Sequence, residues 1–495
     1  MVGCGSLEQT SKVGRLGIPK ATALQSPVVW PLPNASSAPP AGVWAFRSRP
    51  DLRPPAVEVT KKARGTTPGY IFVAPEKSHA RQGGSLMVDD RGRVVWFRPL
   101  PGKYGRAMNF EVQSYRGRPV LTWMETPGKV ASEYVISDSS YREIARFPAA
   151  HGYDGDHHEF LISPQDTALI AIYDVVPQDL SPVGGPKNGV AVQGIVQELD
   201  IETGKVIFEW HSLEHVGIEE SYGKPGEDAD YPGLDYFHLN SIDVDHDNNL
   251  LVSARKTWTV YKVDRKTGKV IWRLGGKRSD FEMGPGARFA FQHDARRQKD
   301  GTLTIFDNGM TVFRDGAARA VEESRGIVLE LDEKKMKASL LRQYTHPEGL
   351  RADAAGNVQV LPNGNVFVGW GRALHSSEFD HDGKLLFDAK LPAGSRSYRA
   401  FRFPWSGHPT DRSAAAAERS SEDEVRVYAS WNGATEVASW EVLAGPSPDQ
   451  LRSLGSVPRD GFETAIAART PDAYVAAQAT DSSRRVLGTS DPVKL

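Results

Sequence analysis

Three histidines lie at matching positions in similar segments of the chain, and an arginine lies at the end of one of these segments. His158, His238 and His293 each begin a run of apolar residues that is typical of a strand, and Arg255 ends the second run of one such segment. An imidazole can act as a nucleophile or proton carrier near neutral pH, and a guanidinium holds negative charge with a planar fork of donors. These side chains can form one reaction centre only if a repeated architecture directs them to a common place.

The segments that carry these residues share one pattern, in which two apolar stretches flank a polar turn. Turns such as Asp247-Asn248 and Lys299-Asp300-Gly301 separate stretches of alternating or continuous apolar residues, which indicates β-hairpins. A fourth copy lacks the leading histidine. The four predicted hairpins are residues 157–174, 238–255, 293–309 and 353–371.

A second type of hairpin alternates with the first. Its tip is an Asp followed by Gly-Lys or Gly-Arg, where glycine supplies the positive φ of the turn, and an apolar strand follows. Copies occur at residues 88–100, 199–210, 263–274 and 379–391, with a weaker one at 329–344. One hairpin of each type makes four strands, so the alternation predicts an all-β fold, a six-bladed β-propeller. An irregular array of sandwiches would not explain the alternation.

The chain is predicted to have four parts. Residues 1–68 form a partly irregular N-terminal extension rich in Pro, Ser and Ala, and residues 69–407 form the propeller. Residues 408–424 are polar and of low complexity, which is typical of a linker. Residues 425–495 contain short alternating strands between turns, which predicts an immunoglobulin- or fibronectin III-like β-sandwich.

Composition excludes several classes of function. The chain has 495 residues, 39% of them hydrophobic and 25% charged, which describes a globular protein with a large core. A net charge of −2 gives no support for a nucleic-acid partner. No apolar stretch approaches the roughly twenty residues that a transmembrane helix needs.

The single cysteine, Cys4, excludes an intrachain disulfide and a redox mechanism. Its setting, MVGCGS, is similar to the end of a bacterial lipoprotein signal without the hydrophobic part. We therefore expect a lipid anchor at Cys4 and an extracytoplasmic location, secreted or lipoprotein. An accidental N-terminal cysteine in a cytoplasmic protein is the alternative.

An ordered series of motifs resembles the arylsulfotransferase family, which are PAPS-independent sulfotransferases built on a six-bladed propeller. The resemblance extends over about residues 46–492 and is greatest to the actinobacterial and fungal branch with a C-terminal sandwich. The cysteine pair of the best-known bacterial members is missing here, and that pair is structural. The motifs are SRPDLRPP (48–55), PGYIFVAP (68–75), FHLNSIDVDHDNNLLVSAR (237–255), VDRKTGKVIWRLGG (263–276), FQHDAR (291–296) and LPNGNVFVGWG (361–371).

The resemblance implies a ping-pong reaction without a cofactor. A histidine takes a sulfuryl group from a phenolic sulfate ester and passes it to a second phenol. By position, His293 matches the sulfated histidine, while His238 and Arg255 match the pair that holds the sulfuryl oxygens and the leaving group. The remaining histidine is His157 or His158, whose side chains face opposite sides in a strand. We expect it to be His158, because an acidic residue follows directly as in the family.

Further residues are expected to support this centre. His157, Asn240 and His375 are predicted to contact the substrate, a small aromatic molecule, and Asn240 with Ser241 is placed to hydrogen bond next to His238. His375 is the exception among histidines in turns or outer loops that we otherwise expect at the surface, which are His246, His346, His381 and His408.

Two expectations concern the immediate setting of the histidines. Gln292 and Asp294 flank His293 and should face away from it, so the group that orients its imidazole should come from another blade. Three histidines can bind zinc or copper. However, the chain has no closely spaced histidine pair beside a carboxylate except His157-His158, whose side chains should diverge, and an arginine disfavours a dication. We therefore predict no metal.

Two other functions fit the same sequence. The pocket can serve a natural-product tailoring enzyme, such as a cyclase, isomerase or hydrolase, that uses histidine and arginine as acid, base and anion clamp. Alternatively, the protein is a non-catalytic surface propeller that binds a carbohydrate or a protein.

Overall fold

The computed structural model describes residues 28–32, 42–76, 82–100, 106–126, 132–314, 317–320 and 322–495, without the side chains of 311–318 and 320. The described chain is all-β, as predicted, and its helices are single 3-10 turns at Ser181–Val183, Ser212–Glu214, Ile218–Glu220 and Gly371–Ala373. None of these described helices is long and apolar enough to span a membrane. Cys4, with its predicted lipid anchor, lies outside the described residues.

Six sheets, each with four antiparallel strands, follow one another along the chain. The first sheet holds β30 (Ala400–Phe403), β3 (Tyr70–Val73), β4 (Gly84–Val88) and β5 (Val94–Pro99); the second holds β6 (Arg106–Tyr115), β7 (Arg118–Thr126), β8 (Glu133–Ser137) and β9 (Glu143–Pro148); the third holds β10 (Gly155–Ile162), β11 (Thr167–Gln178), β12 (Gly189–Asp200) and β13 (Val206–His211). The fourth holds β15 (Leu239–Val244), β16 (Leu250–Ala254), β17 (Thr259–Val263) and β18 (Val270–Gly275); the fifth holds β20 (His293–Arg297), β21 (Leu303–Asp307), β24 (Arg325–Asp332) and β25 (Lys337–Thr345); the sixth holds β26 (Asn357–Val360), β27 (Val366–Gly369), β28 (His375–Phe379) and β29 (Leu385–Lys390).

Shorter strands extend some of these sheets. The additions are β14 (Leu234–Asp235) beside β12, β19 (Glu282–Met283) beside β25 and β2 (Glu58–Lys61) beside β29, and a separate hairpin joins β22 (Thr311–Arg314) to β23 (Ala317–Ala320). All the hairpins predicted from the sequence are formed, for example β15 with β16 and β20 with β21.

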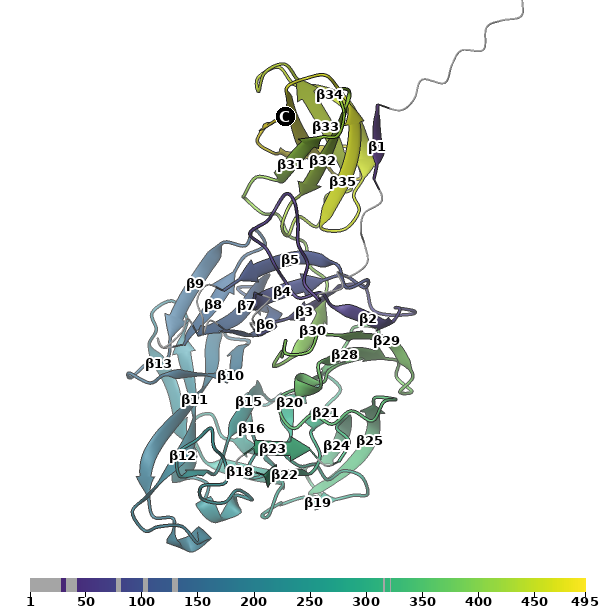
Figure 1. Ribbon diagram of the computed structural model, residues 1–495. Helices are drawn as coiled ribbons and strands as arrows, with labels where there is room; N and C mark the ends of the chain where they lie inside the picture. The colour runs from purple at the N-terminus through teal and green to yellow at the C-terminus, as the bar shows by residue number, and fades with distance from the viewer. Residues whose placement is uncertain are drawn as a thin grey trace, which may run out of the picture.

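The six sheets are arranged around a common centre (Figure 1). The first strands β6, β10, β15, β20, β26 and β30 contact one another in cyclic order. The ring is closed by β30, which pairs with β3 in the register Tyr70↔Phe403 although the two strands lie at opposite ends of this region. Apolar side chains fill the space between neighbouring sheets, so each sheet is buried on both faces.

Four successive inner strands are irregular near their first residues. Register shifts occur between Met108 and Glu111 in β6, within the first residues of β10, between Leu239 and Ser241 in β15, and at the start of β20. A β-bulge inserts an extra residue and changes the side that the neighbouring side chains face. His238, predicted to begin a strand, lies just before β15 with a φ of 58°.

Two further sheets pack face to face at the C-terminus (Figure 1). They consist of β1 (Val29–Pro31), β35 (Glu463–Arg469), β32 (Glu424–Ser430) and β31 (Ala414–Arg419), opposite β34 (Arg452–Pro458), β33 (Ser439–Gly445), β36 (Tyr474–Thr480), β37 (Val486–Thr489) and β38 (Val493–Lys494). We call these two sheets the C-terminal sheet pair.

The linker predicted at residues 408–424 is wrong in part, because it contains β31, an edge strand paired with β32. The run of four alanines in β31 has no alternation of apolar and polar residues, which hid the strand from the sequence pattern. The N-terminal extension also contributes strands at a distance, since β1 pairs with β35 and β2 with β29.

Candidate active site

A cavity of about 670 Å³ lies where the irregular starts of the inner strands meet. Its lining is rich in imidazole, guanidinium and phenol groups, and the cavity therefore offers nucleophiles, anion-binding groups and aromatic walls in one place. These side chains are Arg106, His157, His158, Tyr231, His238, Arg255, His293, Arg372, Arg396 and Tyr398.

His293 is held in a single tautomer at the start of β20. Its Nδ1 lies 2.7 Å from Oδ1 of Asn308 and 3.1 Å from the carbonyl oxygen of Phe291. Both partners are acceptors, so Nδ1 carries the proton, and the backbone N–H of Ala355 accordingly donates to Nε2 at 3.2 Å. Burial and the nearby charge of Arg255 lower the pKa of His293 well below its usual value, although the hydrogen bond to Asn308 opposes this. His293 is therefore a neutral imidazole with its lone pair on Nε2 near pH 7.

The orienting residue was predicted to come from another sheet, and this prediction is wrong. Asn308 directly follows β21, the second strand of the hairpin that His293 begins. His293 is paired with Phe306 across the hairpin, so the chain just beyond β21 passes beside the imidazole. The amide nitrogen of Asn308 also donates to the carbonyl oxygens of Ala352 and Ala355, which fixes its orientation.

The other two histidines are each held by a carboxylate. Nδ1 of His158 donates to Oδ1 of Asp156 in a very short contact, and Nδ1 of His238 donates to Oδ2 of Asp235 at 2.5 Å. The two imidazole rings meet edge to face with their centroids 5.0 Å apart. Their Nδ1 atoms are thus occupied, and Nε2 is the nitrogen left for a substrate.

The two carboxylates differ in their pKa values. Burial raises the pKa of Asp235 to about 6, against the opposing charges of Lys256 and Arg255. Burial would raise the pKa of Asp156 too, but the imidazoles of His158 and His157 outweigh it and hold that pKa well below the usual range. Burial also lowers the pKa of His238 well below its usual value. Asp156 therefore keeps its negative charge to a lower pH than Asp235 does.

Arg255 supplies a buried cation to the cavity. It directly follows β16, and its backbone N–H donates to the carbonyl oxygen of His238 at 2.9 Å, which ties the two residues together. Its Nη2 donates to the carbonyl oxygen of Asp353 at 2.8 Å, and its guanidinium carbon lies 4.9 Å from the ring centroid of Phe291. Its buried Nε has no hydrogen-bond partner among the described residues. That N–H is available to an anionic oxygen.

His157 and His158 both line the cavity, contrary to the expectation that neighbours in a strand diverge. Their rings stack with centroids 4.2 Å apart and planes 26° apart. The register shift between Gly155 and Phe160 is the reason, because the two residues lie within the bulge of β10. Burial lowers the pKa of His157 to about 4, and the charges of His158 and the cavity arginines contribute to this.

A family model described as arylsulfotransferase (ASST) matches residues 117–391, more than half of the chain. The chain belongs to the arylsulfotransferase family. A search of curated proteins found no match to this chain.

Solved structures resemble the family member only distantly. A protein of unknown function from Bacteroides caccae is 12% identical, with 68% of this chain and 99% of that chain covered at a TM-score of 0.42. A catalytically inactive virginiamycin B lyase from Staphylococcus aureus, solved with quinupristin, is 7% identical to this chain. The match covers 83% of this chain and 99% of the lyase chain at a TM-score of 0.34. Similarity at this level says nothing about the reaction.

Five of the seven site residues predicted from the sequence line the cavity, and two do not. Asn240 is fully buried and its amide donates to the carbonyl oxygen of Gln292 at 2.7 Å, which joins β15 to β20. Ser241 likewise accepts the backbone N–H of Ala295. His375 is buried in β28, away from the cavity lining, with its Nδ1 2.9 Å from Oδ2 of Asp388.

Two groups of residues have the composition of a metal site. One is Asp156, His157 and His158 in the cavity, and the other is His346, His375 and Asp388. His346 was expected at the surface but is 5% exposed. Its Nδ1 accepts the backbone N–H of Glu348, so its proton lies on Nε2, which faces Asp388 at 3.3 Å. Both imidazoles of the second group thus face the carboxylate of Asp388, which holds the three side chains together.

The sequence interpretation missed four side chains that shape the site. Asp156 and Asp235 precede their histidines by two and three residues, and this spacing was a usable signal. Asn308 stands at the polar end of a predicted hairpin, which is a weaker signal. Tyr398 has none, because it precedes β30 and reaches the cavity only when the ring of sheets closes.

Proposed function

We propose that this protein transfers a sulfuryl group from a phenolic sulfate ester to an acceptor phenol through a sulfohistidine at His293. The proposal includes the finer fold, a six-bladed β-propeller with an immunoglobulin- or fibronectin III-like C-terminal sandwich. Membership of the arylsulfotransferase family supports sulfuryl transfer, and six four-stranded sheets closed in a ring support the propeller. The family also supports an aromatic sulfate as the small-molecule substrate.

In the first half of the reaction, the Nε2 lone pair of His293 attacks sulfur and the bond between sulfur and the aryl oxygen breaks. The electron pair of that bond leaves with the phenolate, which takes a proton from the Nε2 of His158; in this step His158 carries a proton on both nitrogens. Arg255 holds the sulfuryl oxygens, and His238 joins it once the bound anion has brought a proton to its Nε2. In the second half, the deprotonated histidine takes the proton of the acceptor phenol, whose oxygen attacks sulfur and releases His293.

The observation that carries this proposal is the fixed tautomer of His293. Asn308 is a neutral partner and holds the proton on Nδ1, so the lone pair of His293 lies on Nε2, where it accepts the backbone N–H of Ala355 at 3.2 Å until the substrate displaces that contact. Arg255 lines the same cavity and has a buried Nε–H without a hydrogen-bond partner among the described residues.

The decisive test is intact-mass spectrometry after exposure to p-nitrophenyl sulfate. We expect a labile sulfuryl adduct on the peptide that contains His293, together with release of nitrophenol when a phenol is added. His293→Ala should lose both the adduct and at least about a thousandfold in kcat. His246→Ala, which changes an exposed histidine outside the cavity, is the control.

Other outcomes separate the alternatives. Wild-type rates in His293→Ala would refute the sulfohistidine. Inert aryl sulfates, together with turnover of a natural product that depends on His293, would identify a tailoring enzyme. Ligand binding that survives loss of all three histidines would identify a non-catalytic binding protein.

A further inference from the structure

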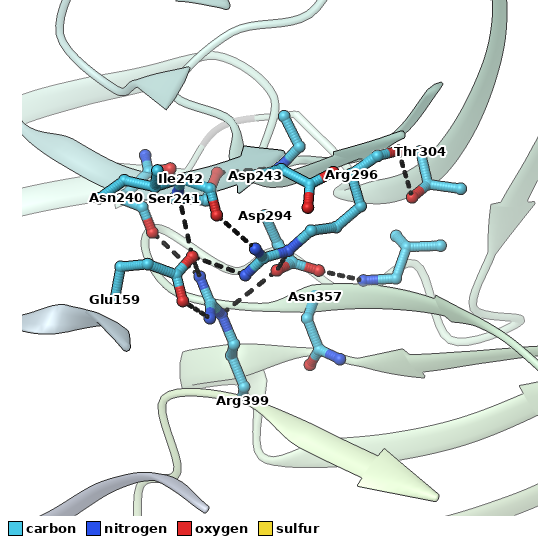
Figure 2. Close-up of polar contacts among 12 residues, drawn as sticks. Glu159, Asn240, Ser241, Ile242, Asp243, Asp294, Arg296, Thr304, Asn357 and Arg399 are labelled. Atoms are coloured by element: carbon cyan, nitrogen blue, oxygen red, sulfur yellow. Dashed lines mark hydrogen bonds and ion pairs between the residues drawn. The ribbon is translucent and has the colours of Figure 1, made fainter. Parts of the chain in front are cut away.

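A buried group of charged side chains lies among the inner strands, where the side chains point toward one another (Figure 2). It consists of Glu159, Asp294, Arg296 and Arg399, and we call it the ionic plug. The exposed fraction of these side chains is 0% for Glu159 and Arg399, 2% for Asp294 and 17% for Arg296. None of the four lines the cavity.

The members of the ionic plug are joined to one another by hydrogen bonds and ion pairs, although the buried Nε of Arg399 has no hydrogen bond among the described residues. Glu159 accepts two N–H groups of Arg399, at 3.1 and 3.3 Å, and one of Arg296 at 2.6 Å. Asp294 accepts Nε of Arg296 at 2.9 Å and lies 3.4 Å from Nε of Arg399. Two carboxylates thus face two guanidinium groups, and this pairing offsets the cost of burying charges away from water.

The same group joins the inner strands of five sheets. Glu159 belongs to β10, Asp294 and Arg296 to β20, and Arg399 directly precedes β30. Backbone groups of β15 complete the contacts, since Ile242 donates to Glu159 and Asn240 accepts from Arg399 at 3.0 Å. The last link is to β26, where the N–H of Val358 donates to Asp294 at 3.1 Å.

Three members of the plug directly follow a cavity residue in the chain. His158 precedes Glu159, His293 precedes Asp294 and Tyr398 precedes Arg399. One peptide unit therefore connects each cavity side chain to a charged side chain that is fixed on the other side of the backbone. The backbone is unusual at one of these links, because Asp294 has a φ of 54°, a conformation that must be held by its surroundings.

Tyr398 contacts two of the cavity histidines with its ring. Its ring lies edge to face with His158 at a centroid distance of 5.2 Å and contacts His293 at 6.1 Å. The guanidinium of Arg399 lies 5.1 Å from the same ring. The position of Tyr398 between the two histidines depends on where Arg399 is anchored.

We propose that the ionic plug is a positioning device for the reaction, in which Arg399 sets the mutual placement of His158, His293 and Tyr398. The plug touches no reacting atom, so Arg399 acts through its neighbours. The catalytic part of this inference rests on the proposed sulfuryl transfer, whereas the placement of the imidazoles is a property of the folded protein alone.

Arg399→Lys tests the inference because it keeps the positive charge and removes the planar set of N–H donors of the guanidinium. A lysine offers one point of attachment and cannot bind both oxygens of Glu159 and the Asn240 carbonyl in the same planar geometry. Arg402→Lys is the matched control. Arg402 lies in β30, is also 0% exposed, and its Nε is 2.8 Å from a fully buried glutamate, Glu378, but no cavity residue adjoins it.

Two measurements separate positioning from stability. Nitrogen-15 NMR of the imidazoles should show altered tautomer populations for His158 and His293 in Arg399→Lys and unchanged spectra in Arg402→Lys. With p-nitrophenyl sulfate, kcat should fall by about 10- to 100-fold in Arg399→Lys with KM altered less than about threefold, because geometry in the transition state is lost rather than substrate binding. Both variants should lose similar thermal stability.

Unchanged imidazole spectra in folded Arg399→Lys would overturn the inference, and so would an equal loss of kcat in Arg402→Lys. If Arg399→Lys does not fold, Arg296→Lys replaces it, since that side chain is partly exposed and binds the same Glu159. A wild-type protein inactive on aryl sulfates would refute the proposed function only, because the imidazole spectra would still report the placement.

Discussion

The partner of each Nδ1 distinguishes the three cavity histidines. Asn308 is uncharged, so it fixes the tautomer of His293 without favouring a second proton. A carboxylate accepts from Nδ1 of His158 and another from Nδ1 of His238, while burial lowers the pKa of His238 well below its usual value. In the proposed ping-pong transfer, one histidine serves as the nucleophile and another as the acid and base, and these roles need different surroundings.

Replacement of Asp235 by Asn should alter the pH profile. Burial raises the pKa of Asp235 to about 6, so the carboxylate is ionised above this pH and takes up a proton below it. The wild-type kcat/KM for aryl sulfate should therefore fall as the pH drops through about 6. In Asp235→Asn this acid limb should vanish, and the plateau should lie about tenfold lower because His238 has lost its charged partner.

The control for that experiment is Asp156→Asn, since the pKa of Asp156 is well below the usual range and contributes no limb near pH 6. An acid limb that persists unchanged in Asp235→Asn would show that another group titrates there.

Among the secondary-structure elements, the inner strands decide the site because they are bulged where they meet. Bulges near the starts of β6, β10, β15 and β20 turn side chains from several sheets toward one cavity. Regular strands would have sent His157 and His158 to opposite faces. Within the irregular stretches of β10 and β20, Glu159 and Asp294 point away from the cavity into the ionic plug.

Glu111 of β6 should make the stability of the ring depend on pH. Burial raises its carboxyl pKa to about 8, from an ordinary value of 4.5, although Arg296 and Arg399 oppose the shift. Between these values the folded protein holds a proton that the unfolded chain has lost, so the free energy of unfolding falls by up to about 1.4 kcal/mol for each pH unit of increase.

Glu111→Gln removes this titration. Its melting temperature relative to the wild type should be a few degrees higher at pH 8 than at pH 5, as measured by calorimetry. Glu58→Gln, on the exposed strand β2, is the control, and its melting temperature should change with pH in the same way as that of the wild type. A melting-temperature difference that does not change with pH would contradict the raised pKa of Glu111.

On the scale of the whole molecule, the C-terminal sheet pair rests on the outer strand of the first sheet (Figure 1). The side-chain amide of Asn432 accepts the N–H of Phe97 and donates to its carbonyl oxygen, both at 2.9 Å, and so pairs with β5 as another strand would. The phenol of Tyr141 donates to the carbonyl oxygen of Gly433 at 2.8 Å. The sheet pair thereby protects an edge strand, away from the cavity lining.

Asn432→Ala should weaken this contact without affecting catalysis. Two backbone groups of Phe97 lose their partners, which should cost about 1–3 kcal/mol. We expect faster limited proteolysis between the ring and the sheet pair and a lower melting temperature, with kcat on aryl sulfate unchanged. Asp449→Ala, at an exposed turn of the sheet pair, is the control. A comparable loss of kcat would show instead that the sheet pair acts on the active site.

Local sequence determined the parts of this protein that depend on local physics. Alternating apolar residues and Asp-Gly turns specify hairpins within a few residues, so their positions and the all-β class were predictable. The repeated position of a histidine at the start of a hairpin indicated His158, His238 and His293, and Arg255 followed from the same hairpin as His238.

Only the tertiary structure decided how these residues meet. Bulges depend on the packing of neighbouring sheets, so the sequence alone did not show that His157 and His158 lie in the cavity together, and it did not keep Asn240 and His375 out of it. Tyr398 and Arg399 come from the segment that closes the ring, far along the chain from His158 and Glu159. Contacts between such distant residues depend on the closed ring, and no local pattern records them.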